Sequence, residues 1–184
     1  MRLPYIPDDP VMPNAEDQAI VTAVKERRGG KLIELDKALL HAPPISGGWN
    51  AFLKSVRTQN SLPASIREIA IARVAALNSA WYEWEAHAPL LQQTGEVKPE
   101  AVEKLKDRKN SASDLGLDER HAAVVEVTDA MTLNVIVPDA KMEKLKKLFS
   151  EREVVEVVAT VSAYNCVMAL DVGEMSEKYG VDMS

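Results

Sequence analysis

Cysteine is nearly absent from this chain of 184 residues, in which Cys166 is the single thiol. One thiol cannot form an intrachain disulfide, a C-x-x-C redox pair or a cysteine-rich zinc module. The sequence therefore excludes chemistry that needs two thiols within one chain. It also predicts a protein of a reducing, cytoplasmic compartment, where disulfides are rare.

Long apolar runs and an excess of positive charge are also missing. No segment approaches the roughly 18 consecutive apolar residues of a membrane-spanning helix, and residues 1–5 contain no signal-type apolar stretch. The chain has 22 Lys and Arg against 28 Asp and Glu, which gives a net charge of −6. We therefore expect a soluble protein that binds neither a membrane nor nucleic acid.

Helical patterns occupy most of the sequence. Four prolines fall within residues 1–13, which predicts an extended arm there, because proline cannot sit inside a helix. Beyond the arm, apolar residues recur every three to four positions, and only the short run 135–137 is rich in β-branched residues. A length of 184 residues fits one domain. We therefore predict a single all-α domain over residues 1–184.

The motif Ser-x-Arg-Glu occurs twice, ending once at Glu68 and once at Glu153. A serine followed three residues later by a glutamate is the capping-box signature, so each copy predicts the start of a helix. An offset of 85 positions (153 − 68 = 85) also aligns apolar residues after the two motifs. We interpret residues 65–95 and 150–180 as two related helical units. Chance similarity between two amphipathic helices is the alternative.

Aromatic and charged side chains gather in the first of these units. Trp81, Tyr82 and Trp84 fall within four residues, and Glu83 stands among them. Glu83 and His87 are four positions apart, so on a helix they share a face with Cβ atoms about 5–6 Å apart. A carboxylate beside an imidazole orients the ring and raises its pKa, and aromatic walls exclude water. The sequence therefore predicts a proton-transfer pair.

Glu68 and Arg73 precede this pair on an apolar segment. Position 87 comes 19 residues after Glu68, which in one straight helix is a separation of roughly 28 Å. Asn78 and Ser79 form the poorest helix-forming dipeptide between them and offer an N-cap for a second helix. If the chain turns there, Glu68, Arg73 and His87 converge from two helices. If it does not, Glu68 is only a helix cap.

Several of these residues also have a structural interpretation. Arg73 is the only charge between positions 69 and 82, so we expect its helix to be buried all round. Its structural partner would be Glu68 or an acid at an interface, since an unpaired buried charge is costly. Trp81 and Trp84 would pack in a core or an interface. A metal site would need a third ligand besides Glu83 and the histidine, and His41 and His121 are expected at the surface.

Three short motifs follow one another in the first unit. Arg67-Glu68 precedes the apolar helix, Glu83-x-x-x-His87 follows it, and Gly95 comes eight residues after the histidine. With the proline-rich arm and the second Arg-Glu helix, this pattern resembles the carboxymuconolactone decarboxylase family, which includes the alkylhydroperoxidase-D-like proteins. The resemblance covers most of the chain. It implies an all-helical fold that assembles as trimers or hexamers, with the active site near a subunit contact.

The cysteine positions separate the branches of this family. The peroxidase branch has cysteines twelve and fifteen residues after the glutamate that matches Glu68, and here those positions hold Ala80 and Glu83. Cys166 matches neither and lies in the apolar second unit, where we expect it to pack in the core. The resemblance therefore points away from disulfide-based peroxide reduction and toward the lactone decarboxylase branch. The aromatic cluster departs from the bacterial decarboxylase pattern, which leaves the substrate open.

The resemblance implies a cofactor-independent carboxy-lyase that acts on a small unsaturated or lactone carboxylic acid. His87 would protonate the carbanion that loss of carbon dioxide leaves, with Glu83 orienting the imidazole. We expect no metal and no other cofactor. The alternatives are a non-enzymatic oligomeric binding protein on the same fold and a residual peroxidase activity through the lone thiol. The catalytic candidates are His87, Glu83 and Glu68, and the substrate-binding candidates are Arg73, Trp81, Tyr82 and Trp84.

Overall fold

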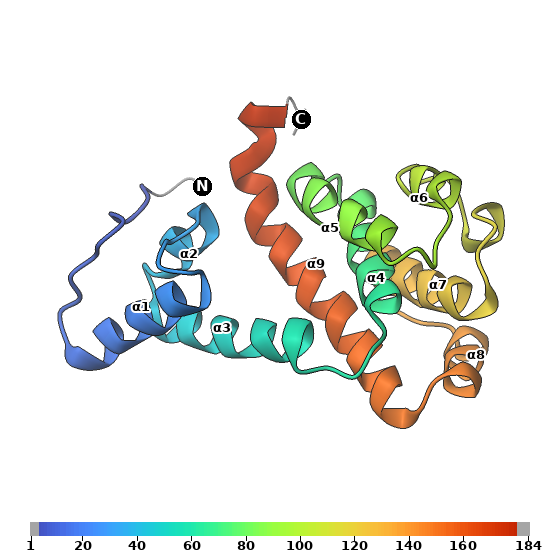
Figure 1. Ribbon diagram of the computed structural model, residues 1–184, viewed down its shortest axis with the longest axis horizontal. Helices are drawn as coiled ribbons and strands as arrows, with labels where there is room; N and C mark the ends of the chain where they lie inside the picture. The colour runs from blue at the N-terminus through green and yellow to red at the C-terminus, as the bar shows by residue number, and fades with distance from the viewer. Residues whose placement is uncertain (1–3, 180–184) are drawn as a thin grey trace. The chain divides into compact units, whose positions relative to one another are not determined.

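The described part of the chain is entirely helical. The structure is a computed structural model that describes residues 4–179, with side chains up to Met168. Over this range it contains nine α-helices, one 3-10 helix and no strand, which confirms the predicted all-α class (Figure 1). The helices are α1 (Ala15–Arg27), α2 (Glu34–Leu39), α3 (Pro43–Thr58), α4 (Ala64–Leu77), α5 (Trp81–Gln93), α6 (Pro99–Leu105), η1 (Ala112–Asp114), α7 (Glu119–Asn134), α8 (Asp139–Leu148) and α9 (Glu151–Tyr179).

The helices form two compact units, one that ends at Gln59 and one that begins at Asn60. A single domain over residues 1–184 stays a prediction. The first unit holds the arm and α1 to α3. Its small apolar core contains Val21, Val24, Leu32 and Leu40, against which Ile6, Met12 and Ile20 pack.

The arm is extended, as its prolines predict. Residues 4–13 contain no helix, and residues 1–3 lie outside the described part. Two acidic residues of the arm pair with lysines of the first unit. Asp8 lies 2.6 Å from the amine of Lys37, and Asp9 pairs with Lys25. These ion pairs and the apolar contacts together hold the arm on α1 and α2.

Helix α4 is the centre of the second unit. Twelve of its 14 residues are buried, because α5, α6, α7 and α9 all pack around it (Figure 1). This confirms that the apolar segment around Arg73 is buried on all sides. A helix in this position brings its few polar side chains, Glu68 and Arg73 among them, into the interior of the unit.

The two predicted capping boxes have different outcomes. At α9 the box forms, because the Ser150 amide donates to Glu153 Oε2 at 2.8 Å and the Glu153 amide donates back to the serine hydroxyl at 3.3 Å. At α4 the helix already starts at Ala64, with no side-chain cap. Ser65 is therefore inside the helix, and its hydroxyl donates to Glu96 instead. Of the two interpretations of Glu68, the one in which it is only a helix cap is therefore excluded.

The chain breaks between α4 and α5 at the predicted dipeptide. Helix α4 ends at Leu77, Ser79 takes a φ of +56°, and α5 begins at Trp81. The N-cap of α5 is Ala80, without a side-chain hydrogen bond, so neither residue of the dipeptide acts as the predicted cap. Asn78 instead donates to the Val74 carbonyl and to Asn165 of α9.

The second related unit has no such break. Helix α9 runs for 29 residues from Glu151 to Tyr179, and position 180 of the predicted unit lies outside the described residues. The predicted unit at residues 65–95 is therefore a pair of helices, α4 and α5, whereas the described part of the predicted unit at residues 150–180 is one continuous helix. Neither α9 nor any other helix in the described range is long and apolar enough to cross a membrane.

Candidate functional site

His87 lies at the centre of a buried polar cluster. Its side chain is about 3% exposed, and its Nδ1 atom lies 2.6 Å from Glu68 Oε2. On the other edge of the ring, Nε2 lies 3.3 Å from Glu83 Oε2 and 3.3 Å from the Tyr164 hydroxyl. The predicted Glu83 and His87 pair is present, and Glu68 is a second and closer carboxylate.

Three helices bring these four side chains together. Glu68 comes from α4, Glu83 and His87 come from α5, and Tyr164 comes from α9. The break between α4 and α5 is what makes the contact possible, because it lets α5 fold back against α4. Helix α9 packs on both of them (Figure 1).

The carboxylates set the charge of the imidazole. Burial by itself lowers the pKa of His87, but the hydrogen bonds with Glu68 and Glu83 and their negative charges outweigh it, so the pKa is raised above its ordinary value. Burial raises the pKa of Glu68, but the hydrogen bond and charge of His87, with further help from Arg67, hold it below its ordinary value. The cluster therefore favours an imidazolium that is paired with a carboxylate.

The two ring nitrogens of His87 are held unequally. Nδ1 donates to Glu68 at 2.6 Å, a short distance typical of a charge-assisted hydrogen bond. Both contacts of Nε2 are 0.7 Å longer (3.3 − 2.6 = 0.7). The Glu83 side chain is 12% exposed and that of Glu68 is 6% exposed. Nε2 is therefore the nitrogen with the looser contacts, and it faces the more exposed carboxylate.

Tyr164 is a member of the cluster that the sequence did not indicate. Its ring stands edge-on to the imidazole, with centroids 5.2 Å apart and planes at 85°. The buried positions Val157, Val161, Tyr164 and Met168 follow a helical spacing of four, three and four. That register could have placed Tyr164 on the inner face of α9. It could not have shown which side chain the tyrosine meets, 77 positions away.

Arg73 does not converge with Glu68 and His87. Its guanidinium is buried, and Nε and Nη2 donate to the two carboxylate oxygens of Asp129 at 2.7 and 3.1 Å. The remaining N–H groups donate to the carbonyls of Leu105, Asp107 and Asn110. All five donors of the side chain are thus used. Its acidic partner is Asp129 and not Glu68, no N–H group is left over for a substrate carboxylate, and Arg73 holds α7 and the segment after α6 against α4.

The aromatic residues of α5 lie at different depths. Trp84 is buried, whereas Trp81 and Tyr82 are half-buried. The amine of Lys106 lies 5.3 Å from the centroid of the Trp81 ring. Trp84 thus belongs to the core, as its structural interpretation predicts, and a role for Trp81, Tyr82 and Trp84 as a substrate wall stays a prediction.

Two expectations for single residues are wrong. His121, expected at the surface, is 4% exposed, because it shares a helical face with the buried Val124, Val125 and Thr128, whereas His41 is exposed as expected. Cys166, expected in the core, is exposed, because it falls between the inward-facing positions Tyr164 and Met168 of α9. Among the described side chains, no three His, Cys, Asp or Glu residues are grouped so that they could hold a metal ion.

No protein-family model matches the sequence, and no curated protein matches it significantly. Solved structures do resemble it in fold. An uncharacterised peroxidase-related protein from Silicibacter sp. superposes with a TM-score of 0.67 at 18% identity, over 92% of this chain and 89% of its own. A protein of unknown function from Agrobacterium tumefaciens, suggested to be the antioxidant defence protein AhpD, gives 0.64 at 19% identity, over 76% and 93%.

A third similar structure is the debrominase Bmp8 in its apo form, with a TM-score of 0.64 at 12% identity over 86% of this chain and 83% of its own. At these identities the likeness concerns the fold. Membership of the carboxymuconolactone decarboxylase family stays a prediction from the motifs. The chain has the all-helical fold of AhpD-like, peroxidase-related proteins.

Proposed function

We propose that His87 is the proton donor of a cofactor-independent carboxy-lyase that acts on a small unsaturated or lactone carboxylic acid. The observation that carries this proposal is that the two ring nitrogens of His87 have hydrogen-bond contacts of different lengths. Glu68 binds Nδ1 at 2.6 Å, while Nε2 keeps two longer contacts of 3.3 Å. A general acid needs one nitrogen that is anchored and one whose proton can leave.

The proton follows a short path in this proposal. Loss of carbon dioxide breaks a carbon–carbon bond and leaves its electron pair on a carbon conjugated with a carbonyl group. The Nε2 proton of His87 moves to that carbon, and the ring becomes a neutral imidazole that Glu68 still holds through Nδ1–H. Glu83, the more exposed of the two carboxylates, has to turn from Nε2 to admit the substrate. A proton from solvent then restores the imidazolium.

The same fold is compatible with a second candidate, an oligomeric binding protein without catalysis. The observation in its favour is the burial of the cluster, since Glu68 and His87 are both almost fully covered within one chain. In that case the ion pair only fixes α5 against α4. Peroxide reduction by a thiol pair is not proposed, because the two relevant positions hold Ala80 and Glu83 and the lone Cys166 is on the outer side of α9.

The test is turnover of a panel of small unsaturated and lactone carboxylic acids, followed by release of carbon dioxide and loss of the conjugated ultraviolet absorbance. We expect His87→Gln to abolish turnover, and His41→Gln, a histidine exposed in the first unit, to leave it unchanged. Cys166→Ser should also leave it unchanged. Full turnover in His87→Gln would remove the mechanism, and a folded wild-type protein that turns over none of the acids would favour the binding protein.

We also propose that the chain assembles as a trimer or a hexamer, as the resemblance implies. Light scattering coupled to size exclusion measures the mass directly. A purified protein that stays at the 20.2 kDa of one chain at micromolar concentration would contradict the assembly. The proposed role of His87 would be unaffected by that result.

A further inference from the structure

Tyr164 of α9 places a hydroxyl group beside the imidazole of His87. Its side chain is 1% exposed, and its hydroxyl oxygen lies 3.3 Å from Nε2 of His87. The tyrosine ring stands edge-on to the imidazole, with the two planes at 85°. A phenylalanine would fill the same space and make the same ring contact. What the tyrosine adds is therefore a hydroxyl group next to a buried ring nitrogen.

The two groups next to Nε2 differ in the hydrogen bonds that they can make with it. Glu83 Oε2 also lies 3.3 Å from Nε2, but an ionised carboxylate only accepts hydrogen bonds. A tyrosine hydroxyl both accepts and donates. Glu83 therefore matches only the imidazolium, which carries a proton on Nε2, whereas Tyr164 matches both the imidazolium and the neutral ring.

The neutral ring that follows proton transfer has a buried acceptor. Glu68 holds the Nδ1 proton at 2.6 Å, and the neighbouring Arg67 favours its charged form. Once Nε2 has lost its proton, this nitrogen can only accept a hydrogen bond. A buried acceptor without a donor costs free energy, and a carboxylate cannot supply the donor. The Tyr164 hydroxyl can supply it by turning its O–H bond toward Nε2.

Helix α9 fixes the position of Tyr164 independently of Glu83. The tyrosine lies on the inner face of α9, between the buried Val161 and Met168, and α9 packs on both α4 and α5. The Glu83 side chain, in contrast, is 12% exposed. When Glu83 turns away to admit a substrate, as the proposed function requires, Tyr164 therefore keeps its place beside Nε2.

We propose that Tyr164 is a positioning residue for His87, whose hydroxyl accepts from Nε2–H of the imidazolium and donates to Nε2 after the proton has left. The inference rests on the proposed function, in which His87 gives its Nε2 proton to a substrate carbon. The tyrosine keeps its own proton throughout, and no covalent bond forms at it. Tyr164 thereby stabilises the neutral ring and keeps Nε2 aimed in the same direction before and after the transfer.

The test is NMR titration of the histidine rings in the wild type and in Tyr164→Phe. The groups that face the imidazole are Glu68 of α4, Glu83 of α5 and Tyr164 of α9, and Arg67 pairs with Glu68. In the variant the imidazolium keeps both carboxylates, while the neutral ring loses its donor. We therefore expect Tyr164→Phe to raise the pKa of His87, so that its acid dissociation constant falls about tenfold.

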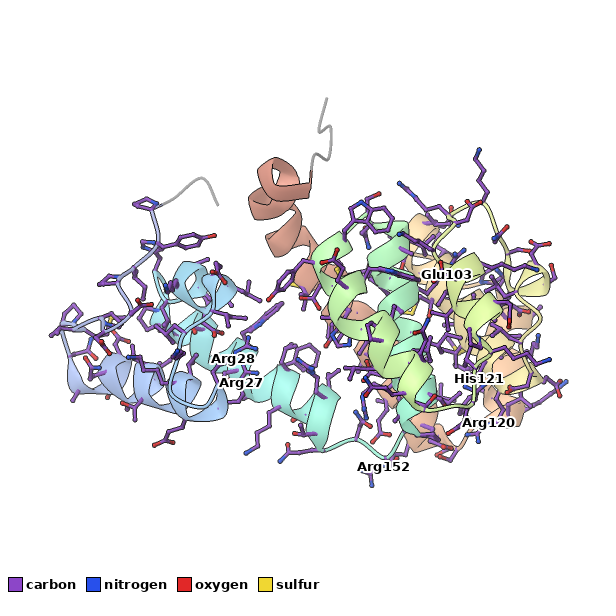
Figure 2. All side chains as sticks on the ribbon, turned by 45° about the horizontal axis from the view of Figure 1, so that its top comes forward. Arg27, Arg28, Glu103, Arg120, His121 and Arg152 are labelled. Carbon is purple, nitrogen blue, oxygen red and sulfur yellow. The ribbon has the colours of Figure 1, made fainter. Side chains whose placement is uncertain are left out.

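The two other results of this titration would overturn the proposal. An unchanged pKa would mean that the tyrosine only fills space, and a lowered pKa would mean that its hydroxyl only accepts. Glu83→Gln removes a negative charge next to the same nitrogen and should lower the pKa of His87, which shows that the titration detects changes there. The signals of His121, which lies beside Arg120 at the start of α7 (Figure 2), should be unchanged in both variants.

A measurement on the wild type covers the case in which Tyr164→Phe does not fold. Nitrogen NMR at a pH above the pKa of His87 distinguishes the two tautomers of the neutral ring. We expect the proton on Nδ1 and an unprotonated Nε2 that accepts a hydrogen bond. A neutral ring with its proton on Nε2 would overturn the proposal.

Kinetics separate this proposal from the proposed function. With an acid that the wild type turns over, Tyr164→Phe should lower kcat about tenfold at unchanged KM, because the tyrosine acts on the ring and not on the substrate. Tyr5→Phe, at an exposed position of the arm, should change neither constant. An unchanged kcat in Tyr164→Phe would overturn the positioning role. If the wild type turns over no acid and Tyr164→Phe still raises the pKa of His87, the lyase function is contradicted and the hydrogen-bond exchange stands.

Discussion

Glu68 and Glu153 end the same Ser-x-Arg-Glu motif and have opposite roles. Glu153 caps its own helix through Ser150 and makes a further contact with Arg120. The corresponding Ser65 donates to Glu96 and not to Glu68. Glu68 Oε2 instead lies 2.6 Å from Nδ1 of His87. The motif is the same, so the difference arises from what packs against each helix start.

The helices that follow the two motifs differ in the same way. Helix α4 ends after 14 residues and folds back into α5, whereas α9 continues for 29 residues. At the position where α4 holds the buried Arg73, an offset of 85 places Val158 in α9 (73 + 85 = 158). The central helix thus carries charges that must be paired inside the unit, whereas the side chains of α9 that the structure describes, up to Met168, include no buried charge. The following predictions test this contrast, beginning with the largest effect.

Arg73→Val makes the central helix resemble α9 at this position. It removes the donors to Asp129 and to three carbonyl groups. Removing one partner of a buried charge pair typically costs about 3–5 kcal/mol, and we expect a loss of that size in the free energy of unfolding, measured with urea. Arg67→Val, at a partly exposed site, is the control and should cost far less. A change of less than about 1 kcal/mol in Arg73→Val would contradict the structural role.

Glu68→Gln and Glu153→Gln form a matched pair of variants. Glu68→Gln leaves the buried imidazole with one carboxylate fewer, and we expect it to lower the free energy of unfolding by about 2–3 kcal/mol. Glu153→Gln removes only a cap charge on a partly exposed side chain, so we expect less than about 1 kcal/mol. Equal losses measured by denaturant titration would show that the buried contact of Glu68 with His87 contributes no more to stability than the exposed cap at Glu153.

The stability of the Glu68 and His87 pair should depend on pH in two directions. The folded pKa of His87 is raised, so its contribution is complete below the ordinary histidine pKa and is lost as the pH rises through the folded value. The folded pKa of Glu68 is lowered, so its contribution is complete above the ordinary glutamate pKa and is lost as the pH falls through the folded value. The pair therefore contributes most between about pH 4.3 and about pH 6.5.

The difference in unfolding free energy between wild type and Glu68→Gln should accordingly be largest in that window and should shrink on both sides of it. Glu153 has a lowered pKa through its hydrogen bonds with Ser150, with no histidine partner. The difference between wild type and Glu153→Gln should therefore shrink only toward acid. If this difference in unfolding free energy shrank equally toward alkaline pH for both variants, Glu68 would not be distinguished from Glu153 by a histidine partner.

The smallest expected effect concerns the break that distinguishes α4 and α5 from α9. Ser79 has a φ of +56°, a conformation that costs less for glycine than for serine. We expect Ser79→Gly to raise the free energy of unfolding by a few tenths of a kcal/mol, up to about 1 kcal/mol. Ser79→Val should lower it, since a β-branched residue fits this conformation poorly. Thermal unfolding of both variants measures the sign, and a stabilising valine would mean that the turn is not where the structure places it.

Local features of the site were within reach of the sequence. The spacing of Glu83 and His87 predicts a shared helical face, and the weak helix formers Asn78 and Ser79 predict the break that brings Glu68 to the histidine. Both are short-range relations, in which the geometry of a helix or a turn sets the outcome. The start of α4 was not predictable in this way, because Pro63 takes the N-cap position and leaves the serine inside the helix.

The sequence could not predict which residues far apart in the chain contact one another. Asp129 lies 56 positions from Arg73, and Tyr164 lies 77 positions from His87. The burial of His121 depends in the same way on packing across the second unit. A residue's spacing along the chain says which face of its own helix it occupies, but not which helix covers that face.

The sequence by itself determined the all-helical class, the Glu83 and His87 face, and the absence of a thiol pair at positions 80 and 83. The tertiary structure alone decided that Glu68 is the partner of an imidazole and Glu153 a cap. The physical reason is desolvation. In the interior of the second unit a carboxylate loses water and is stabilised by the nearest cation, whereas at the exposed start of α9 the local backbone amides suffice.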